Sequence, residues 1–142
     1  MKQVRVLNGV NLGRLGTREP ELYGAVTHAQ LAEHLIGTGA ALGLAVEVRQ
    51  TDAEAELVAW LHEAADAGAA VVLNAGAWSH YSLAIADAAR EVGQLVEVHI
   101  TNIFAREEFR HHSVMSGVAS GVIVGLGLAG YDYALAHLAA QN

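Results

Sequence analysis

Residues 71–76 read Val-Val-Leu-Asn-Ala-Gly, a run of apolar side chains that ends abruptly in a polar, glycine-containing connection. A short apolar run bounded in this way is typical of a strand buried on both faces of a parallel sheet. Further short runs in which apolar residues predominate lie at residues 4–7, 45–48, 96–100 and 122–124. The sequence therefore predicts five strands.

Apolar residues at helical spacing fill the intervals between these strands. Thr27 with Gln30, and Thr51 with Glu54, form the pattern of a capping box at which a helix begins. We expect helices at 27–42, from 51 through 64, at 82–92 and at 131–140. Alternating strands and helices in a chain of this length predict a flavodoxin-like α/β fold. This fold would be one three-layer domain over residues 1–142, with a five-stranded parallel sheet in the order 2-1-3-4-5.

The composition excludes several classes of protein. Hydrophobic residues make up 53% of the 142 residues and charged residues 16%, which predicts one well-buried core. The net charge of −7 argues against a nucleic-acid binder, and the absence of cysteine excludes disulfides, thiolate zinc sites and iron–sulfur clusters. Neither a signal peptide nor an apolar run of about 20 residues is found, so we expect a cytoplasmic protein with no membrane partner. Lys2 is the single lysine, so a Schiff-base lysine is not expected.

Two motifs that could suggest a cofactor or a metal do not support one. Residues 125–130 match the dinucleotide fingerprint G-x-G-x-x-G, but the sequence ends 12 residues later. It offers no following strand with the acidic residue that would hold a ribose. We interpret these glycines as close packing between a strand and a helix. His111 and His112 are adjacent and point in different directions, so we expect no metal site.

A parallel sheet with this strand order binds its ligand beyond the carboxyl ends of the strands, near the switch point between strands 1 and 3. Three long connections start at that edge, at residues 8–24, 74–81 and 101–120. The first has 17 residues and several glycines, and a connection of this length often acts as a lid. Polar side chains with catalytic potential lie in or beside these connections: Asn11, Arg18, Tyr23, Asn74, His80, Glu97, His99, Thr101 and Arg110.

The residues alone leave the role of the Glu97–His99 pair and the role of Tyr23 open. Glu97 and His99 lie two positions apart on one strand and so project to the same face. A carboxylate beside an imidazole favours its protonated form, as a general acid requires, but an ion pair at the sheet edge would have the same sequence. Tyr23 follows a loop with Arg14 and Arg18, and an arginine stabilises a tyrosinate where the loop excludes solvent. Tyr23 is therefore either a base or a packing anchor for its loop.

Several segments of the chain, taken together, resemble the type II 3-dehydroquinate dehydratases. Agreement of separate motifs, in order along nearly the whole chain, is far more specific than any one of them. The matching segments are 8–12 (NGVNL), 16–20 (GTREP), 23–24 (YG), 74–77 (NAGA) with His80, 97–102 (EVHITN), 106–113 (REEFRHHS) and 130–131 (GY).

The resemblance implies a flavodoxin-like fold and the trans-elimination of water from 3-dehydroquinate to 3-dehydroshikimate, without a cofactor. It implies that Tyr23 is the base, assisted by Arg18, and that Asn11 helps to hold the water that stabilises the enolate. It implies that His99 is the general acid and that Glu97 orients it. The same family resemblance implies a place in the shikimate pathway or in quinate catabolism.

The resemblance also implies contacts to substrate and between subunits. The residues implied for substrate binding are Asn74, His80, Asp87, Ile100, Thr101 and Arg110. In the family, the residue that matches Asp87 reaches the site of a neighbouring subunit. Family members form trimers that assemble into dodecamers, so a homo-oligomer is expected.

The chain departs from the family pattern at a few positions. Val10 replaces the usual Pro, Thr101 replaces Ser, Phe104 replaces His, and the stretch before Glu97 lacks a Pro. These departures concern affinity and the motion of the first connection rather than the reaction. Two other functions remain as alternatives. One is a protein of the same fold that binds a small carboxylate without converting it. The other is a flavin- or nucleotide-binding module, for which the sequence has no convincing phosphate loop.

Overall fold

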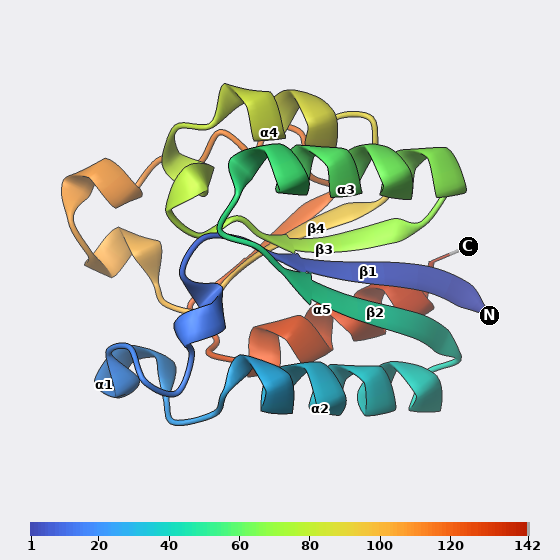
Figure 1. The fold of residues 1–142 in the computed structure, drawn as a ribbon, viewed down its shortest axis with the longest axis horizontal. Coiled ribbons are helices and arrows are strands. Elements are labelled where there is room, and N and C mark those ends of the chain that lie inside the picture. Colours follow the sequence, from blue (N-terminus) through green and yellow to red (C-terminus); the bar gives the residue numbers. More distant parts are fainter. Residues whose placement is uncertain (142) are drawn as a thin grey trace.

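The computed structural model describes residues 1–141 and contains one sheet of five parallel strands (Figure 1). The order across the sheet is β2-β1-β3-β4-β5, as the sequence predicts. The strands are β1 (Lys2–Asn8), β2 (Leu44–Gln50), β3 (Ala70–Asn74), β4 (Leu95–His99) and β5 (Gly121–Val124). Asn8 pairs in register with Asn74, so the neighbouring strands β1 and β3 end side by side in amides. The predicted flavodoxin-like arrangement is confirmed.

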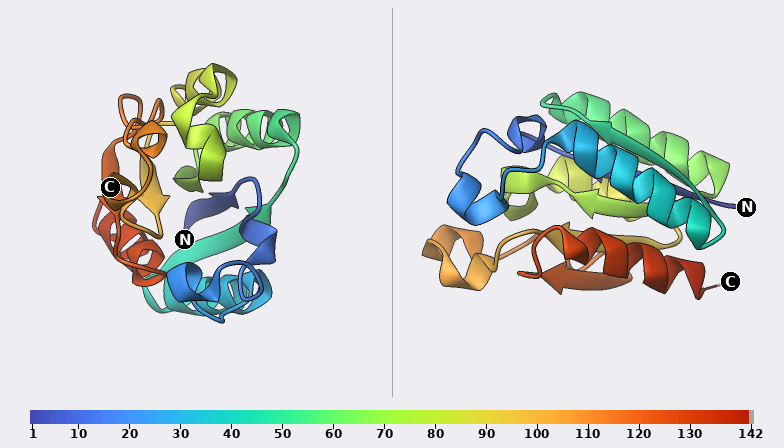
Figure 2. Two further views of the ribbon diagram at one scale, coloured as in Figure 1. Left: turned by 90° about the vertical axis from the view of Figure 1, so that its left-hand side faces the viewer. Right: turned by 90° about the horizontal axis from the view of Figure 1, so that it is seen from below.

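Helices cover both faces of the sheet. They are α2 (His28–Ala41), α3 (Glu54–Ala67), α4 (Leu83–Ala89) and α5 (Ala129–Ala139). α3 and α4 lie on one face, and α2 and α5 lie on the other (Figure 1, Figure 2). The buried side chains form one cluster on each face, and alternate strand residues contribute to each: Leu73 to the first and Val72 to the second. This alternation follows from the pleat of the strand and explains why residues 70–73 of β3 are all apolar.

The two predicted capping boxes have different outcomes. The first is formed at the start of α2, where Thr27 and Gln30 each accept the backbone N–H of the other. The second is wrong, because α3 begins at Glu54 without a side-chain cap and Thr51 Oγ1 accepts the N–H of Ala53 at 3.0 Å. Thr51 lies just after β2 and still bonds to β1, because its own N–H donates to the carbonyl of Asn8 at 3.0 Å. A tertiary hydrogen bond therefore holds this residue away from the capping position.

α4 is shorter than the helix predicted at 82–92. It ends at Ala89, and the next turn is tightened, because the N–H groups of Glu91 and Val92 donate to carbonyls three residues back. Val92 enters the core cluster beneath α3 and α4. The tighter turn directs its side chain there and ends the helix early.

The connections at the carboxyl edge contain short helices rather than unstructured chain. The first holds η1 (Leu12–Arg14) and α1 (Pro20–Tyr23), the second η2 (Gly76–His80), and the third η3 (Ile103–Ala105) and η4 (Glu108–Arg110). These segments form the left-hand end of the molecule in Figure 1, which faces the viewer in the left view of Figure 2. None of the helices within residues 1–141 has the length and hydropathy of a transmembrane span.

Candidate active site

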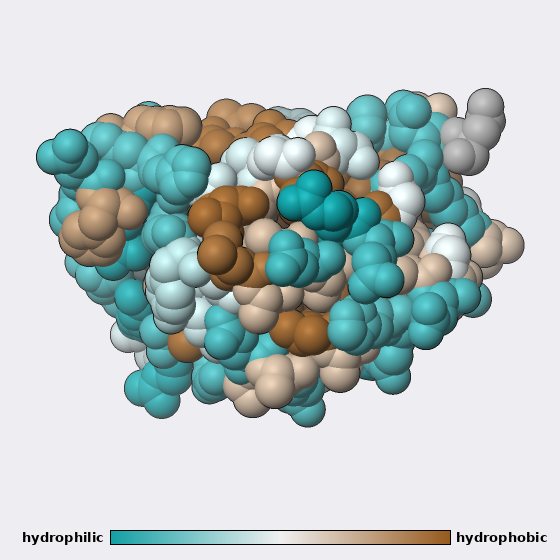
Figure 3. All heavy atoms as spheres, turned by 90° about the horizontal axis from the view of Figure 1, so that it is seen from above, coloured by the Kyte–Doolittle hydropathy of each residue, from teal (hydrophilic) through white to brown (hydrophobic). Residues whose placement is uncertain are grey.

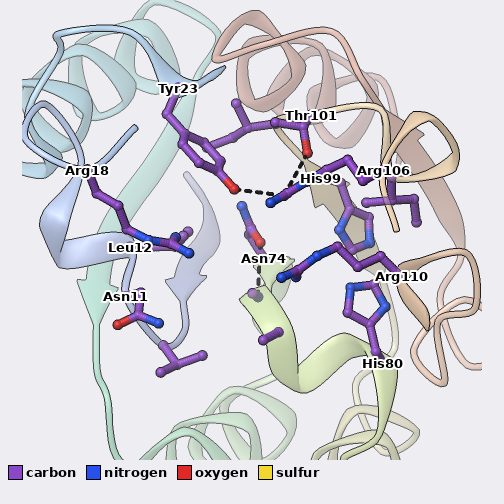
Figure 4. A pocket seen from close by; sticks show the side chains of 15 residues that line it. Asn11, Leu12, Arg18, Tyr23, Asn74, His80, His99, Thr101, Arg106 and Arg110 are labelled. Carbon is purple, nitrogen blue, oxygen red and sulfur yellow. Dashed lines mark hydrogen bonds between the residues drawn. The ribbon is translucent and has the colours of Figure 1, made fainter. Parts of the chain in front are cut away.

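A cavity of about 190 Å³ opens at the carboxyl edge of the sheet, where the three connections meet (Figure 4). Sites for drug-sized ligands usually measure about 300–1,000 Å³, so this cavity suits a smaller molecule. Most of the residues predicted for the site line it: Asn11, Arg18, Tyr23, Asn74, His80, His99, Ile100, Thr101 and Arg110. The lining also includes Val10, Leu12, Gly76, Ala77, Ile103 and Arg106.

Two of the predicted residues do not line the cavity. Glu97 is 1% exposed and lies behind His99. Asp87 is exposed on α4, away from the lining of this cavity. Its assignment to the site of a neighbouring subunit stays a prediction.

Glu97 and His99 form a buried pair on β4. Nε2 of His99 is hydrogen-bonded to Oε2 of Glu97, and Ser113 and Ser116 each donate a hydroxyl to the same carboxylate at 2.6 Å. Burial acts to raise the pKa of Glu97, but these hydrogen bonds outweigh burial and lower it. Glu97 is therefore ionised, and it orients the imidazole so that Nδ1 of His99 is left for a ligand.

Tyr23 reaches the cavity from α1, and its hydroxyl meets an arginine that sequence spacing did not identify. Nη1 of Arg106 donates to the Tyr23 hydroxyl at 2.8 Å and to Thr101 Oγ1 at 3.3 Å (Figure 4). Arg18 was expected to assist Tyr23, and its guanidinium carbon lies 5.7 Å from the centroid of the ring. Within residues 1–141, the cation that contacts the hydroxyl is thus Arg106, and Arg18 contributes a cation–π contact.

α1 is a single helical turn that presents Tyr23. Pro20 starts the turn, and Gly24 ends it with a φ of 79°, which glycine adopts without strain. The ring of Tyr23 packs against the core cluster beneath α2 and α5. The ring anchors the turn while the hydroxyl stays in the cavity. The packing and chemical interpretations of Tyr23 are therefore compatible.

Asn11 has a left-handed backbone, with φ of 68°, which asparagine tolerates better than most residues. Asp52 accepts the N–H of Asn11 at 2.8 Å. Gln50 Nε2 donates to Asp52 at 3.0 Å and to the carbonyl of Gly9 at 3.1 Å, which ties the start of the first connection to the end of β2. The side-chain amide of Asn11 makes no hydrogen bond within residues 1–141, so it is available to a ligand or a water.

Asn74 brings a side-chain amide of fixed orientation to the cavity. Its Oδ1 accepts the N–H of Gly76 at 3.1 Å, and its Nδ2 donates to the hydroxyl of Tyr131 at 2.9 Å. Tyr131 donates in turn to Oδ1 of Asn8 at 2.7 Å. Burial raises the pKa of Tyr131, so its hydroxyl stays protonated.

His80 is a neutral imidazole beside His99. Burial is the largest cause that lowers the pKa of His80. Its Nδ1 donates to the carbonyl of His112 at 2.8 Å, which leaves Nε2 for a ligand. The two rings lie nearly parallel, with centroids 6.3 Å apart.

Arginines make the cavity positive in a protein of net charge −7. Arg18, Arg106 and Arg110 line it, and among the described residues no acidic side chain does. Nε of Arg110 donates to Glu107 at 2.8 Å, so its terminal nitrogens remain for a ligand. A guanidinium with free terminal nitrogens suits a carboxylate, so the site favours a small anionic molecule.

Of the three glycines at 125–130, Gly130 serves the close packing of a helix on a strand that the sequence suggested, Gly125 packs against the connection after β4, and Gly127 has a φ of 65° with open space around it. A Cβ at Gly130 would lie 3.3 Å from Cγ2 of Ile123, and one at Gly125 would lie 3.0 Å from Cβ of Asn102. Within residues 1–141, no cluster of three His, Cys, Asp or Glu side chains is suited to a metal.

Comparison with known proteins places this arrangement in a family. The sequence profile of "Dehydroquinase class II" matches residues 2–139. The chain belongs to the class II dehydroquinase family. The 3-dehydroquinate dehydratase of Salinispora tropica is 65% identical over 140 residues, which cover 98% of this chain and 98% of that protein. The 3-dehydroquinate dehydratase of Mycobacterium avium is 58% identical over 139 residues, which cover 97% of each chain.

Solved structures agree with this assignment. The crystal structure of type II dehydroquinase from Propionibacterium acnes matches with a TM-score of 0.98 and 58% identity, covering 99% of this chain and 98% of that one. The type II dehydroquinase from Butyrivibrio crossotus matches with a TM-score of 0.94 and 39% identity, covering 96% and 97%. The family and the enzyme class predicted from the sequence are confirmed.

The departures from the dehydroquinase family pattern have different positions in the site. Thr101 keeps the hydroxyl, which accepts a hydrogen bond from Arg106, and Val10 lines the cavity. Phe104 is 59% exposed and lies outside the lining, so it is the least connected to the cavity.

Proposed function

We propose that this class II dehydroquinase removes water from 3-dehydroquinate by trans-elimination through an enolate, giving 3-dehydroshikimate without a cofactor. One observation carries the proposal. A single cavity combines a tyrosine hydroxyl bonded to a cation, an imidazole with a buried carboxylate behind it and free guanidinium nitrogens. Elimination beside a ketone needs a base, an acid at the leaving group and stabilisation of the enolate, and this cavity holds candidates for each.

Tyr23 acts as the base that takes the proton from the carbon next to the ketone. Arg106 stabilises the tyrosinate through its hydrogen bond, and Arg18 adds its charge at the ring. Two unit charges about 3 Å apart attract by about 1.4 kcal/mol in water and about 5.5 kcal/mol at an effective dielectric of about 20. Exclusion of water by the first connection therefore decides how much the arginines stabilise the base.

His99 acts as the general acid that protonates the departing hydroxyl. Its Nε2 stays with Glu97, so Nδ1 delivers the proton. The Glu97 carboxylate stabilises the imidazolium, and Ser113 and Ser116 keep that carboxylate ionised and in place.

The remaining lining residues bind the substrate and the enolate. Asn11, whose amide is unbonded within residues 1–141, holds the water that stabilises the enolate. Arg110 binds the substrate carboxylate. The residues that complete the contacts to the hydroxyls and the carboxylate are Asn74, His80, Ile100 and Thr101.

We also propose a cytoplasmic homo-oligomer built from trimers, as a dodecamer, in which Asp87 completes the site of a neighbour. Apolar patches interrupt the hydrophilic surface on the face that α3 and α4 form (Figure 3). Leu83 on α4 is 67% exposed, and Asp87 lies one turn further along the same helix. An interface that covers this helix would bury the leucine and place the carboxylate beside the next subunit.

The proposed reaction belongs either to the shikimate pathway or to quinate breakdown, since both include the same step.

The test is to add 3-dehydroquinate to the purified protein and to follow the ultraviolet absorbance of the conjugated enone product. A fast rise that is insensitive to chelator and to borohydride supports a cofactor-free elimination that forms no Schiff base. Binding of the substrate without a rise would favour a carboxylate-binding protein of the same family.

A further inference from the structure

The connection that carries Tyr23 and Arg18 is closed at its base by one side-chain hydrogen bond. Asn8 is the last residue of β1 and His28 the first of α2, so these two residues flank the segment 9–27. Nδ2 of Asn8 lies 3.0 Å from Nε2 of His28. This contact joins the two ends of the segment that presents the proposed base.

The two halves of this segment are fixed in different ways. The first half is bonded to the sheet, because the N–H of Gly9 donates to the carbonyl of Asn74 at 2.8 Å and the N–H of Asn11 donates to Asp52. In the second half, the backbone hydrogen bonds of residues 14–24 stay within the segment. Tyr23 and Leu15 pack against the core, and Tyr23 is hydrogen-bonded to Arg106. Among residues 1–141, the contact between Asn8 and His28 is the side-chain hydrogen bond that joins the two ends of the segment.

The base contact continues into the cavity through a chain of hydrogen bonds whose direction is fixed. The N–H of Gly76 can only donate, so Oδ1 of Asn74 faces it and Nδ2 of Asn74 faces Tyr131. The Tyr131 oxygen accepts that bond, and its proton goes to Oδ1 of Asn8. Nδ2 of Asn8 then faces His28, whose Nε2 has to accept and so carries no proton.

The surroundings of His28 agree with a neutral ring. It is half-buried, and burial lowers its pKa below the ordinary value of 6.5. Among residues 1–141, no acidic or basic side chain of β1, the first connection, α2 or α5 forms an ion pair with it, and the Asn8 amide is its hydrogen-bond partner. A proton on Nε2 would set two donors against each other, and Asn8 cannot turn over without breaking its bond to Tyr131.

We propose that His28 and Asn8 are positioning residues for the dehydratase reaction: their hydrogen bond holds the Tyr23 segment closed and completes the chain of hydrogen bonds that runs through Tyr131 to the amide of Asn74. The contact works only while His28 is neutral. This inference rests on the proposed function, because it concerns the same base, Tyr23, and the same substrate-binding residue, Asn74.

Variants at position 28 test this role. His28→Ala removes the acceptor, whereas His28→Gln offers an amide oxygen at similar reach that does not titrate. His34→Ala is the matched control, because His34 lies on the same helix, is exposed and bonds to Asp132 at 2.8 Å. With 3-dehydroquinate as substrate, we expect KM to rise about fivefold in His28→Ala with a smaller change in kcat, and the other two variants to match the wild type. Below pH 6.5, the ratio of the wild-type KM to the His28→Gln KM should rise.

Limited trypsin digestion gives a readout that does not depend on the reaction. Arg14 is exposed within the segment, and mass spectrometry identifies cleavage after it. We expect about fivefold faster cleavage in His28→Ala and wild-type rates in His28→Gln and His34→Ala. Equal cleavage and equal KM in His28→Ala and the wild type, or no rescue by His28→Gln, would overturn the proposal. A wild type that does not convert 3-dehydroquinate would refute the proposed function, whereas faster cleavage of His28→Ala would still support the closing contact.

Discussion

Replacing Tyr23 with phenylalanine should separate chemistry from binding in this site, because it removes one hydroxyl and leaves the ring in place. The phenyl ring keeps the packing against the core beneath α2 and α5. The guanidinium carbons of Arg18 and Arg106 lie 5.7 Å and 6.0 Å from the ring centroid, and both cation–π contacts remain possible. Arg106 loses one hydroxyl acceptor and retains Thr101. The cavity therefore keeps its shape and its charge.

The two expected effects differ greatly in size. Loss of the proton acceptor should lower kcat by at least about 100-fold, which is about 2.7 kcal/mol of activation free energy. Removing the Tyr23 hydroxyl also removes one hydrogen bond from the cavity. Such a bond contributes about 1 kcal/mol net, so substrate affinity should fall by about tenfold at most. A large fall in kcat with a small change in Kd is the signature of a base.

Initial rates of enone absorbance give kcat, and titration calorimetry on the slow variant gives Kd for 3-dehydroquinate. Tyr133→Phe is the matched control, because Tyr133 on α5 is 56% exposed and lies outside the cavity lining. A Tyr23→Phe enzyme with kcat within about tenfold of the wild type would refute the assignment of Tyr23 as the base. A Tyr23→Phe enzyme with a changed Kd and an unchanged kcat would refute it too.

Three further predictions address binding, stability and acid sensitivity. Arg110→Ala should raise KM by about 10- to 100-fold with little change in kcat, because we propose that its guanidinium binds the substrate carboxylate; a loss confined to kcat would contradict this role. Tyr131→Phe leaves the buried amides of Asn8 and Asn74 each short of a partner, and should lower the free energy of unfolding in urea by about 2–4 kcal/mol. A loss below about 0.5 kcal/mol would contradict that reasoning. Burial opposes the ionisation of Glu97, but its hydrogen bonds hold its pKa below 4.5 in the folded chain. The ionised carboxylate therefore stabilises the fold fully above pH 4.5, and this stabilisation declines as the pH falls further. Unfolding free energies of the wild type and Glu97→Gln should therefore converge below pH 4.5.

The strand order and the place of the site could be predicted because both depend on features that are local in sequence. Short apolar runs that alternate with helices give a parallel sheet, and the carboxyl ends of its strands meet at one edge whatever the connections do. Asn74 and His99 could therefore be placed at the cavity. The pairing of His99 with Glu97 follows from the two-residue repeat of a strand.

Contacts between distant connections could not be predicted in the same way. Arg106 and Tyr23 lie 83 positions apart, and no spacing rule distinguishes Arg106 from Arg14 or Arg18 as the cation at the hydroxyl. Its place within the segment 106–113, after the strand that ends in His99, is the one signal that could have indicated it. At Thr51, a local capping pattern was overridden by a backbone bond to β1 that only the folded sheet supplies.

The proposed acid and the proposed base of this site rest on parts of the fold with different stiffness. His99 ends a strand that is paired on both sides, by β3 and by β5, whereas Tyr23 belongs to a one-turn helix within a long connection. An inhibitor that contacts only the strand side finds its partners already in place, so we expect rapid association and rapid release. An inhibitor that also engages Tyr23 has to fit between the strand and this connection, which slows its arrival and prolongs its residence. Inhibitors of this enzyme are therefore better ranked by dissociation rate than by equilibrium affinity alone.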